Sequence, residues 1–128
     1  MPTVLIAHTS GPFVELLAEQ LSSNYRVHIC HTGADAITLI DRLHPDILIL
    51  YLSLPDIDGI TALHSTKYKP DVVLALTNLT TDNVLQAAFD AGAQDVILIP
   101  ASIDYVIIRM EQLMKKAPPW KLDPERGK

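Results

Sequence analysis

The feature that most constrains the fold of this chain is a run of aliphatic residues without polar alternation. Residues Asp46–Leu52 are nearly all aliphatic, and Val72–Thr77 forms a second run of the same kind. A strand that carries apolar side chains in both directions is buried on both faces, which is typical of a parallel sheet covered by helices. The two runs therefore predict the interior strands of such a sheet.

Apolar segments elsewhere extend this pattern into an alternation of strands and helices. Further strands are expected at Val4–Ala7, Tyr25–Cys30 and Val96–Ile99. Between the strands, apolar residues recur at helical spacing, with Phe13, Leu16, Leu17 and Leu21 in the first helix and Ala36, Leu39, Ile40 and Leu43 in the second. Five strands alternating with five helices predict an α/β domain, and right-handed crossovers favour the flavodoxin-like strand order 2-1-3-4-5.

Capping residues indicate where the helices begin and end. A weaker third helix is expected over Ile60–Lys69, Gly92 is placed to end the fourth helix, and the last helix is expected to run through Lys116. Helix starts are expected at Pro12, Thr32, Thr80 or Thr81, and Ser102. The chain is thus interpreted as one domain over residues 1–117, followed by a tail or the start of a linker over residues 118–128.

Charge and cysteine content exclude several classes of function. The chain has 128 residues and a formal net charge of −5, which argues against nucleic-acid binding by this domain, because phosphate contacts need clustered Lys and Arg. Cys30 is the only cysteine, and its apolar surroundings predict a buried, inert thiol. No signal peptide is recognised, and no apolar stretch approaches the ~20 residues that span a bilayer. A cytoplasmic location without a membrane partner is therefore expected.

Four short motifs lie at fixed separations around the third and fifth predicted strands. They are Pro45 and Asp46 before the third strand, the loop 54–59 after it, residues 91–95 before the fifth strand, and Pro100 after that strand. Together they resemble the motifs of bacterial response-regulator receiver domains, and the resemblance covers residues 3–116. It implies the receiver version of the flavodoxin-like fold and a role in two-component signal transduction or transcription regulation.

The resemblance also assigns positions to the family's phosphorylation site. In the family, two acidic residues after the first strand help to hold Mg²⁺, and an aspartate that ends the third strand accepts the phosphoryl group. A hydroxyl residue ends the fourth strand and a lysine ends the fifth. The matching residues of this chain are His8, Thr9, Tyr51, Thr77 and Ile99, and Val96 takes the place of the aromatic switch residue. Only Thr77 keeps the family's chemistry, so a degenerate phosphorylation pocket is expected.

The acids and the lysine are replaced together, and the joint replacement is physically consistent. Mg²⁺ prefers oxygen ligands from carboxylates and water, so neither a metal site nor any other cofactor site is expected. A lysine left without the acids would be an unpaired buried cation, which Ile99 avoids. Phosphoryl transfer depends on positioning and electrostatic stabilisation. Phosphorylation by the family's mechanism is therefore expected to be excluded at Tyr51.

The individual residues at the strand ends also have simpler interpretations. His8 is expected to be a hydrogen-bonded histidine, with a pH-sensitive group, a phosphohistidine and a metal ligand as alternatives. Tyr51 is expected to pack the former acceptor pocket, with its hydroxyl paired to Thr77 or His8. Thr77 is expected to bond to local backbone or to Tyr51. Asp56 and Asp58 are assigned to capping and turn formation, ahead of a role as phosphoacceptors.

A second candidate surface is the fourth helix, fifth strand and fifth helix, which the resemblance implies as the usual face for dimers or partners. Its candidate residues are Asp90, Asp95, Tyr105, Ile108, Arg109, Glu111 and Gln112. A solvated rim is the alternative interpretation. Exposure of Tyr105 or Ile108 would favour the interface.

Three functions are compared. The favoured one is an atypical, phosphorylation-independent receiver that binds a protein partner or dimerises, with a downstream effector domain left open. The second is a small-molecule binder, since His8 and Gly11 match half of a cobalamin fingerprint, although Ile6 replaces its aspartate; flavin binding is similarly weak. An enzyme is least supported, because no Cys-His, Ser-His-Asp or paired-carboxylate arrangement gathers at the strand ends.

Overall fold

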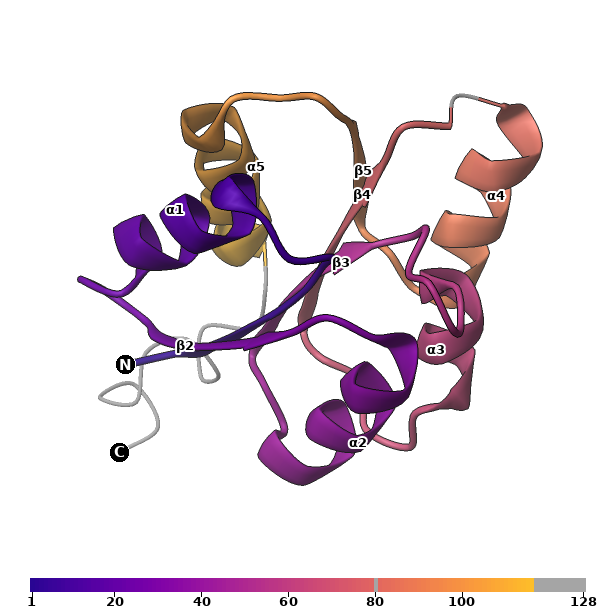
Figure 1. Cartoon of the computed structure of the whole chain (residues 1–128), viewed down its shortest axis with the longest axis horizontal. Helices are drawn as coiled ribbons and strands as arrows, with labels where there is room; N and C mark the ends of the chain where they lie inside the picture. The colour runs from indigo at the N-terminus through magenta and orange to yellow at the C-terminus, as the bar shows by residue number, and fades with distance from the viewer. Residues whose placement is uncertain (80, 117–128) are drawn as a thin grey trace.

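A parallel sheet of five strands forms the centre of the molecule in a computed structural model that describes residues 1–79 and 81–116 (Figure 1). The strand order is β2-β1-β3-β4-β5, which confirms the predicted flavodoxin-like order. The strands are β1 (Thr3–Ala7), β2 (Arg26–Cys30), β3 (Ile47–Tyr51), β4 (Val72–Thr77) and β5 (Asp95–Leu98). The helices are α1 (Pro12–Leu21), α2 (Gly33–Leu43), α3 (Gly59–Ser65), α4 (Asp82–Ala91) and α5 (Ile103–Lys116).

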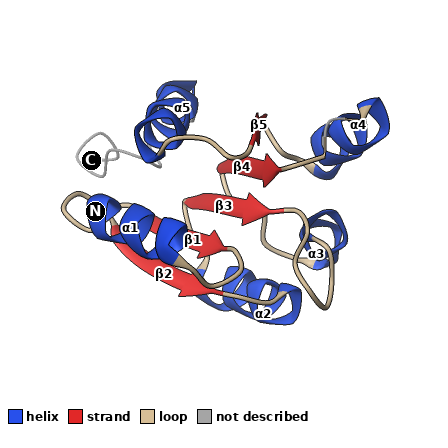
Figure 2. Ribbon diagram, turned by 45° about the horizontal axis from the view of Figure 1, so that its top comes forward, coloured by secondary structure: helices blue, strands red, loops and turns tan. Residues whose placement is uncertain are grey.

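Helices cover both faces of the sheet, α1 and α5 on one side and α2, α3 and α4 on the other (Figure 2). Successive residues of a strand point to opposite faces, so Val4 and Ile6 pack under α1 and α5 while Leu5 and Ala7 pack under α2. All four are fully buried. This two-sided burial is the physical reason for the unbroken aliphatic runs, and each large side chain so buried contributes about 1.5–3 kcal/mol.

Most helix starts follow the expected capping chemistry. The Thr32 hydroxyl accepts from the backbone N–H of Asp35, Thr81 accepts from Val84, and Ser102 accepts from Tyr105. Of the two alternatives for α4, Thr81 is the cap, and Thr80 lies outside the described residues. The predicted tail over residues 118–128 also lies outside them.

Three local expectations are corrected. Helix α3 ends at Ser65 and not at Lys69, because the Asp41 carboxylate binds the backbone N–H groups of Lys67 and Tyr68 and draws the chain away from the helix.

Strand β5 ends at Leu98 and not at Ile99, so Ile99 follows the strand. Its N–H still bonds to the Thr77 carbonyl, but the next residue is a proline, which has no N–H to continue the ladder.

The third correction concerns the buried face of α1. Leu16 was expected in the core but is 46% exposed, whereas Val14 and Ala18 are buried. The buried stripe runs through positions 14, 17, 18 and 21, which is the i, i+3, i+4, i+7 pattern of one helix face. No helix in the described ranges combines the length and the apolar character needed to cross a membrane.

Candidate functional site

The carboxyl ends of the strands bring the predicted site residues to one edge of the sheet. His8 and Thr9 follow β1, Tyr51 and Thr77 are the last residues of β3 and β4, and Ile99 follows β5. The strands run parallel and in register, with Ala7 opposite Leu50, Tyr51 opposite Leu76, and Thr77 opposite Leu98. Ligand sites of open α/β sheets lie at this edge, so the five residues occupy the position where such a fold places its chemistry.

The rings of His8 and Tyr51 stack on each other. Their centroids are 4.4 Å apart and their planes differ by 11°, while Phe13 lies 5.7 Å from His8 in a tilted arrangement. Among the described residues, the Tyr51 hydroxyl has no hydrogen bond to Thr77 or His8, so the expected pairing is replaced by the stack. Tyr51 is only half-buried, so burial does not force a partner on its hydroxyl.

The hydrogen bonds of His8 favour one tautomer of its ring. Its Nδ1 lies 3.2 Å from the Thr9 carbonyl oxygen and 3.3 Å from Thr9 Oγ1. A carbonyl oxygen only accepts, so in the neutral ring the proton belongs on Nδ1 and Nε2 is left as an acceptor. Burial lowers the pKa of His8, the hydrogen bond to Thr9 opposes this, and His31 adds to the lowering.

The other ring nitrogen of His8 is buried without a hydrogen bond. Nε2 has no partner within the part of the chain that the structure describes, and the residue as a whole is 9% exposed. An unsatisfied buried polar atom of this kind costs about 1–3 kcal/mol. His31 does not relieve it, because its Nδ1 bonds to the His8 carbonyl oxygen at 2.8 Å. The imidazole therefore has an unpaired acceptor atom, Nε2, at the strand ends.

The Thr77 hydroxyl is engaged by local backbone. Thr77 is 1% exposed, and its Oγ1 accepts from the N–H of Leu79 at 3.0 Å. Of the two partners expected from the sequence, local backbone and Tyr51, the structure has the first. The hydroxyl thereby holds the start of the loop after β4.

The two carboxylates in the loop after β3 bind helix N-termini. Asp56 accepts from the N–H of Gly33 at 2.7 Å and of Ala34 at 3.0 Å, and Asp58 accepts from Thr61 at 2.9 Å. These backbone bonds lower the pKa of both carboxyl groups. Gly33 allows the close approach, since a Cβ there would lie 2.3 Å from the Ile57 carbonyl oxygen. Capping was predicted for both residues, but the binding of Asp56 to α2 was not.

The donor groups at the strand ends do not fit a Mg²⁺ ion. The edge offers an imidazole, two hydroxyls, a phenol and an aliphatic side chain, whereas Mg²⁺ binds through carboxylates and water. Within residues 1–79 and 81–116, no group of three or more His, Cys, Asp or Glu side chains is placed to hold a metal ion. Cys30, on β2, is buried, and burial raises the pKa of its thiol to about 12.

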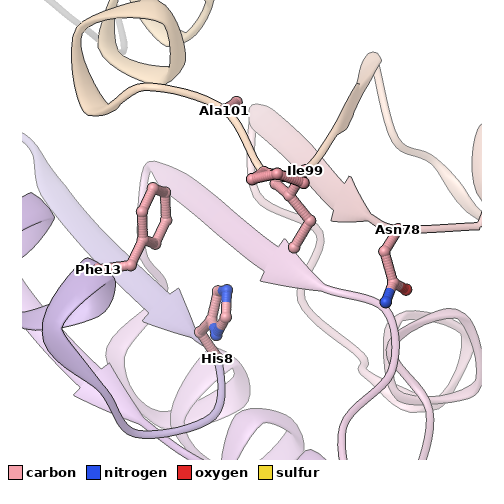
Figure 3. A pocket seen from close by; sticks show the side chains of 6 residues that line it. His8, Phe13, Asn78, Ile99 and Ala101 are labelled. Atoms are coloured by element: carbon pink, nitrogen blue, oxygen red, sulfur yellow. The ribbon is translucent and has the colours of Figure 1, made fainter.

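A cavity of about 320 Å³ opens beside these residues (Figure 3). Figure 3 shows the ring of His8 extending from the end of β1 into the space between Phe13 and Ile99, with Asn78 across from it. The lining residues are His8, Phe13, Asn78, Ile99, Pro100 and Ala101. Sequence reasoning missed four of them; the adjacency of Asn78, Pro100 and Ala101 to strand ends was the available signal, while Phe13 was assigned to the core face of α1.

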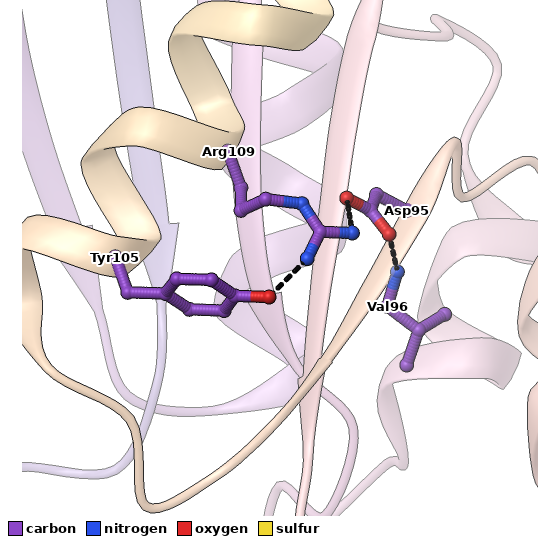
Figure 4. A network of polar contacts seen from close by, with 4 residues as sticks. All are labelled: Asp95, Val96, Tyr105 and Arg109. Carbon is purple, nitrogen blue, oxygen red and sulfur yellow. Dashed lines mark hydrogen bonds and ion pairs between the residues drawn. The ribbon is translucent and has the colours of Figure 1, made fainter.

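The predicted interface residues of β5 and α5 form a polar network (Figure 4). Arg109 makes an ion pair with Asp95 and donates a hydrogen bond to the Tyr105 hydroxyl. The Asp95 carboxylate also accepts from the N–H of Val96 at 2.9 Å and raises the pKa of Arg109. Val96, the predicted switch position, is half-buried and packs on the α2–α3–α4 side of the sheet.

Exposed apolar side chains lie on α4, β5 and α5, the three elements predicted for this face. Phe89 is 47%, Leu98 54%, Tyr105 44% and Ile108 51% exposed. Of the other predicted members, Asp90 accepts from the Gln86 side chain, and Glu111 and Gln112 are exposed on α5. Sequence reasoning missed Phe89 and Leu98, although both lie on the predicted elements. We call Phe89, Leu98, Tyr105 and Ile108 the α4–β5–α5 patch.

The buried state of His8 predicts a pH dependence of stability. Folding lowers the pKa of His8 below its unfolded value of ~6.5, so the unfolded chain takes up more protons than the folded chain as the pH falls. The stability that depends on neutral His8 is therefore fully present above pH ~6.5 and is lost as the pH falls through the folded pKa. Urea unfolding between pH 7 and pH 5 should show a smaller loss of stability in His8→Gln than in the native chain. The exposed His64→Gln serves as control, and an equal pH dependence in all three proteins would contradict this.

Comparison with known proteins places this geometry in a family. Residues 4–111 match the family model described as the response regulator receiver domain. The chain is 35% identical over 101 residues to the regulatory protein LuxO of Vibrio cholerae, an alignment that covers 76% of the chain and 22% of LuxO. It is 29% identical over 119 residues to the response regulator MprA of Mycobacterium avium, covering 91% of the chain and 52% of MprA.

A solved structure gives the same result for the fold. The crystal structure of the signal receiver domain of a putative LuxO repressor protein from Vibrio parahaemolyticus superposes with a TM-score of 0.77 at 25% identity. The alignment covers 90% of this chain and 91% of that one. The chain thus spans between 22% and 52% of the curated relatives described above, but nearly all of an isolated receiver domain.

Proposed function

The chain belongs to the response regulator receiver domain family, and we propose that it is a receiver that acts without phosphorylation of an aspartate. The observation that carries the proposal is the neutral set of side chains at the strand ends, where His8 stacks on Tyr51 and, in the described part of the chain, the nearby carboxylates of Asp56 and Asp58 are bound to helix N-termini. The regulatory names of its relatives, LuxO and MprA, support a role in signalling.

Tyr51 supports the proposal through its position and chemistry. It is the last residue of β3, where the family resemblance places the phosphoacceptor, and it packs against the cores on both faces of the sheet. A phenol held in a stack with an imidazole offers neither the carboxylate nucleophile nor a ligand that Mg²⁺ prefers. In this proposal, the tyrosine fills the acceptor site.

The positions around Tyr51 also lack the charged residues that the family resemblance places there. His8 and Thr9 stand where the resemblance places the metal-binding acids, and Ile99 stands in place of the lysine. Asp56 and Asp58 do not substitute for those acids, because their oxygens accept backbone N–H groups of α2 and α3. Without metal or lysine, the site lacks the positive charge that stabilises a transferring phosphoryl group.

We further propose that the output of this domain is association through the α4–β5–α5 patch, with a second copy as the partner. The charged members Asp95 and Arg109 are paired with each other within the chain, so their charges need no partner from outside. The patch therefore offers exposed apolar and aromatic side chains beside a neutralised polar network, a composition typical of interface centres.

The central part of this proposal is tested with a phosphoryl analogue. Beryllofluoride with Mg²⁺ should leave the amide NMR spectrum unchanged, because the site lacks both the acceptor carboxylate and the metal ligands.

The single variant Tyr51→Asp should also give no change in the spectrum with beryllofluoride, since His8, Thr9 and Ile99 still supply neither metal ligands nor a cation. A matched comparison is the combined variant H8D/T9D/Y51D/I99K, which supplies the whole set. Shifts centred on Tyr51 and Thr77 in the native chain would disprove phosphorylation independence. A stable phosphoryl-analogue complex of Tyr51→Asp would contradict the roles assigned to His8, Thr9 and Ile99.

The dimer is tested with charge substitutions on two exposed apolar residues. Ile108→Glu places an unpaired carboxylate in the patch and should weaken self-association at least about tenfold in sedimentation equilibrium. Leu16→Glu changes a similarly exposed residue on α1, outside the patch, and should leave the association constant unchanged. A monomeric native chain at all accessible concentrations, or equal effects of the two variants, would contradict the proposed interface.

A further inference from the structure

We propose that the cavity at the strand ends binds a small, uncharged ring compound that donates one O–H or N–H hydrogen bond to His8 Nε2. The inference rests on the proposed function in that both concern the same edge of the sheet. It goes further by assigning a ligand to the site in which phosphoryl chemistry has no support. Nothing in the proposed self-association requires such a ligand.

The first argument is the unpaired nitrogen. His8 is more than nine-tenths buried, its Nδ1 is engaged by Thr9, and its Nε2 has no hydrogen-bond partner among the described residues. Figure 3 shows the far end of the ring directed into the space between Phe13 and Ile99. Since Nδ1 carries the proton in the neutral ring, Nε2 requires a donor. A ligand with an O–H or N–H group satisfies it, whereas a pure acceptor does not.

The second argument is the composition of the cavity walls. Phe13, Ile99, Pro100 and Ala101 contribute apolar surface, and within residues 1–79 and 81–116 the polar wall residues are His8 and Asn78. Small-molecule sites are typically apolar cavities with a few placed polar groups, and roughly 300–1,000 Å³ in size. The volume of about 320 Å³ is at the lower end, which fits a compound of one or two rings and is too small for a cobalamin.

The absence of charge in the walls restricts the ligand further. Among the described residues, no Lys, Arg, Asp or Glu side chain lines the cavity, so a charged ligand would lose its hydration without gaining an ion pair from them. The rings of His8 and Phe13, which line the cavity with their centroids 5.7 Å apart, offer aromatic surface to an aromatic ligand. Because Nε2 is itself buried, binding requires a rotation of a half-buried wall side chain such as Phe13 or Ile99.

The cavity is also placed to influence the proposed interaction face. Pro100 and Ala101 form part of its wall and lead through Ser102 into α5. Tyr105 and Ile108 of the α4–β5–α5 patch lie in the first two turns of that helix. A ligand that displaces this wall changes the position from which α5 starts. The cavity is thus a structurally connected input site for the patch.

The test uses indole and 1-methylindole, two probes with the same ring system, of which only indole has an N–H donor. Each is titrated into the ¹⁵N-labelled chain. Indole should give saturable amide shifts at His8, Phe13 and Ile99 and a change in the ¹⁵N shift of His8 Nε2. 1-Methylindole should bind about tenfold more weakly, the difference expected for one hydrogen bond to a buried acceptor.

Two variants separate the hydrogen bond from the cavity. His8→Phe keeps an aromatic ring and removes the acceptor, so it should bind indole and 1-methylindole equally; a native-like amide spectrum verifies its fold. Ala101→Phe fills the cavity from its rim and should abolish binding of both probes. The control His64→Gln changes an exposed residue of α3 and should bind both probes like the native chain.

The absence of shifts at the cavity with indole, or equal affinity of the native chain for both probes, would overturn the inference. Neither outcome affects the beryllofluoride result, which alone tests phosphorylation independence.

Discussion

Burial of the central strands on both faces is the constraint on which the rest of the structure depends. β1, β3 and β4 run parallel and in register, and helices cover both faces, α1 and α5 on one side and α2, α3 and α4 on the other. Parallel strands end at a common edge, which brings His8, Tyr51 and Thr77 together although they are distant in sequence. The fold therefore brings these three positions together whichever side chains occupy them.

At this edge the chain combines the strand-end geometry of the parallel sheet with uncharged side chains. The space near the strand ends is filled by a histidine–tyrosine stack, and the nearby carboxylates cap helices. Such an arrangement requires no cation and carries no buried charge that would have to be compensated. One polar atom at this edge, His8 Nε2, lacks a hydrogen-bond partner among the described residues and lies beside a cavity. In the proposed ligand site, this nitrogen supplies a preference for a hydrogen-bond donor that shape alone would not provide.

The sequence predicted those features that follow from local chemistry and from strand periodicity. The aliphatic runs predicted the sheet, and hydroxyl residues such as Thr32 and Ser102 marked helix starts, because a side-chain oxygen can satisfy N–H groups within three residues. The exposure of Tyr105 and Ile108, on which the interface hypothesis depended, was found in the structure. The interface itself stays a proposal.

Features that depend on contacts between distant segments were not predictable in this way. Helix α3 is shorter than expected because Asp41, on another helix, binds the chain that follows it. Tyr51 was expected to use its hydroxyl, but the position of His8, directly after the neighbouring strand β1, allows the rings to stack instead. The cavity is formed by side chains from three separate loops and from the start of α1, and no single segment of sequence shows that they meet.

A titration with paramagnetic Mn²⁺ shows whether the strand ends hold a divalent cation. Mn²⁺ prefers the same oxygen ligands as Mg²⁺ and broadens the amide signals of residues near its site. If the strand ends hold no such cation, millimolar Mn²⁺ should cause only weak, unsaturable broadening near exposed carboxylates, with the signals of Thr9, Tyr51 and Thr77 unaffected. Saturable broadening centred on those three residues would contradict the absence of a cation there.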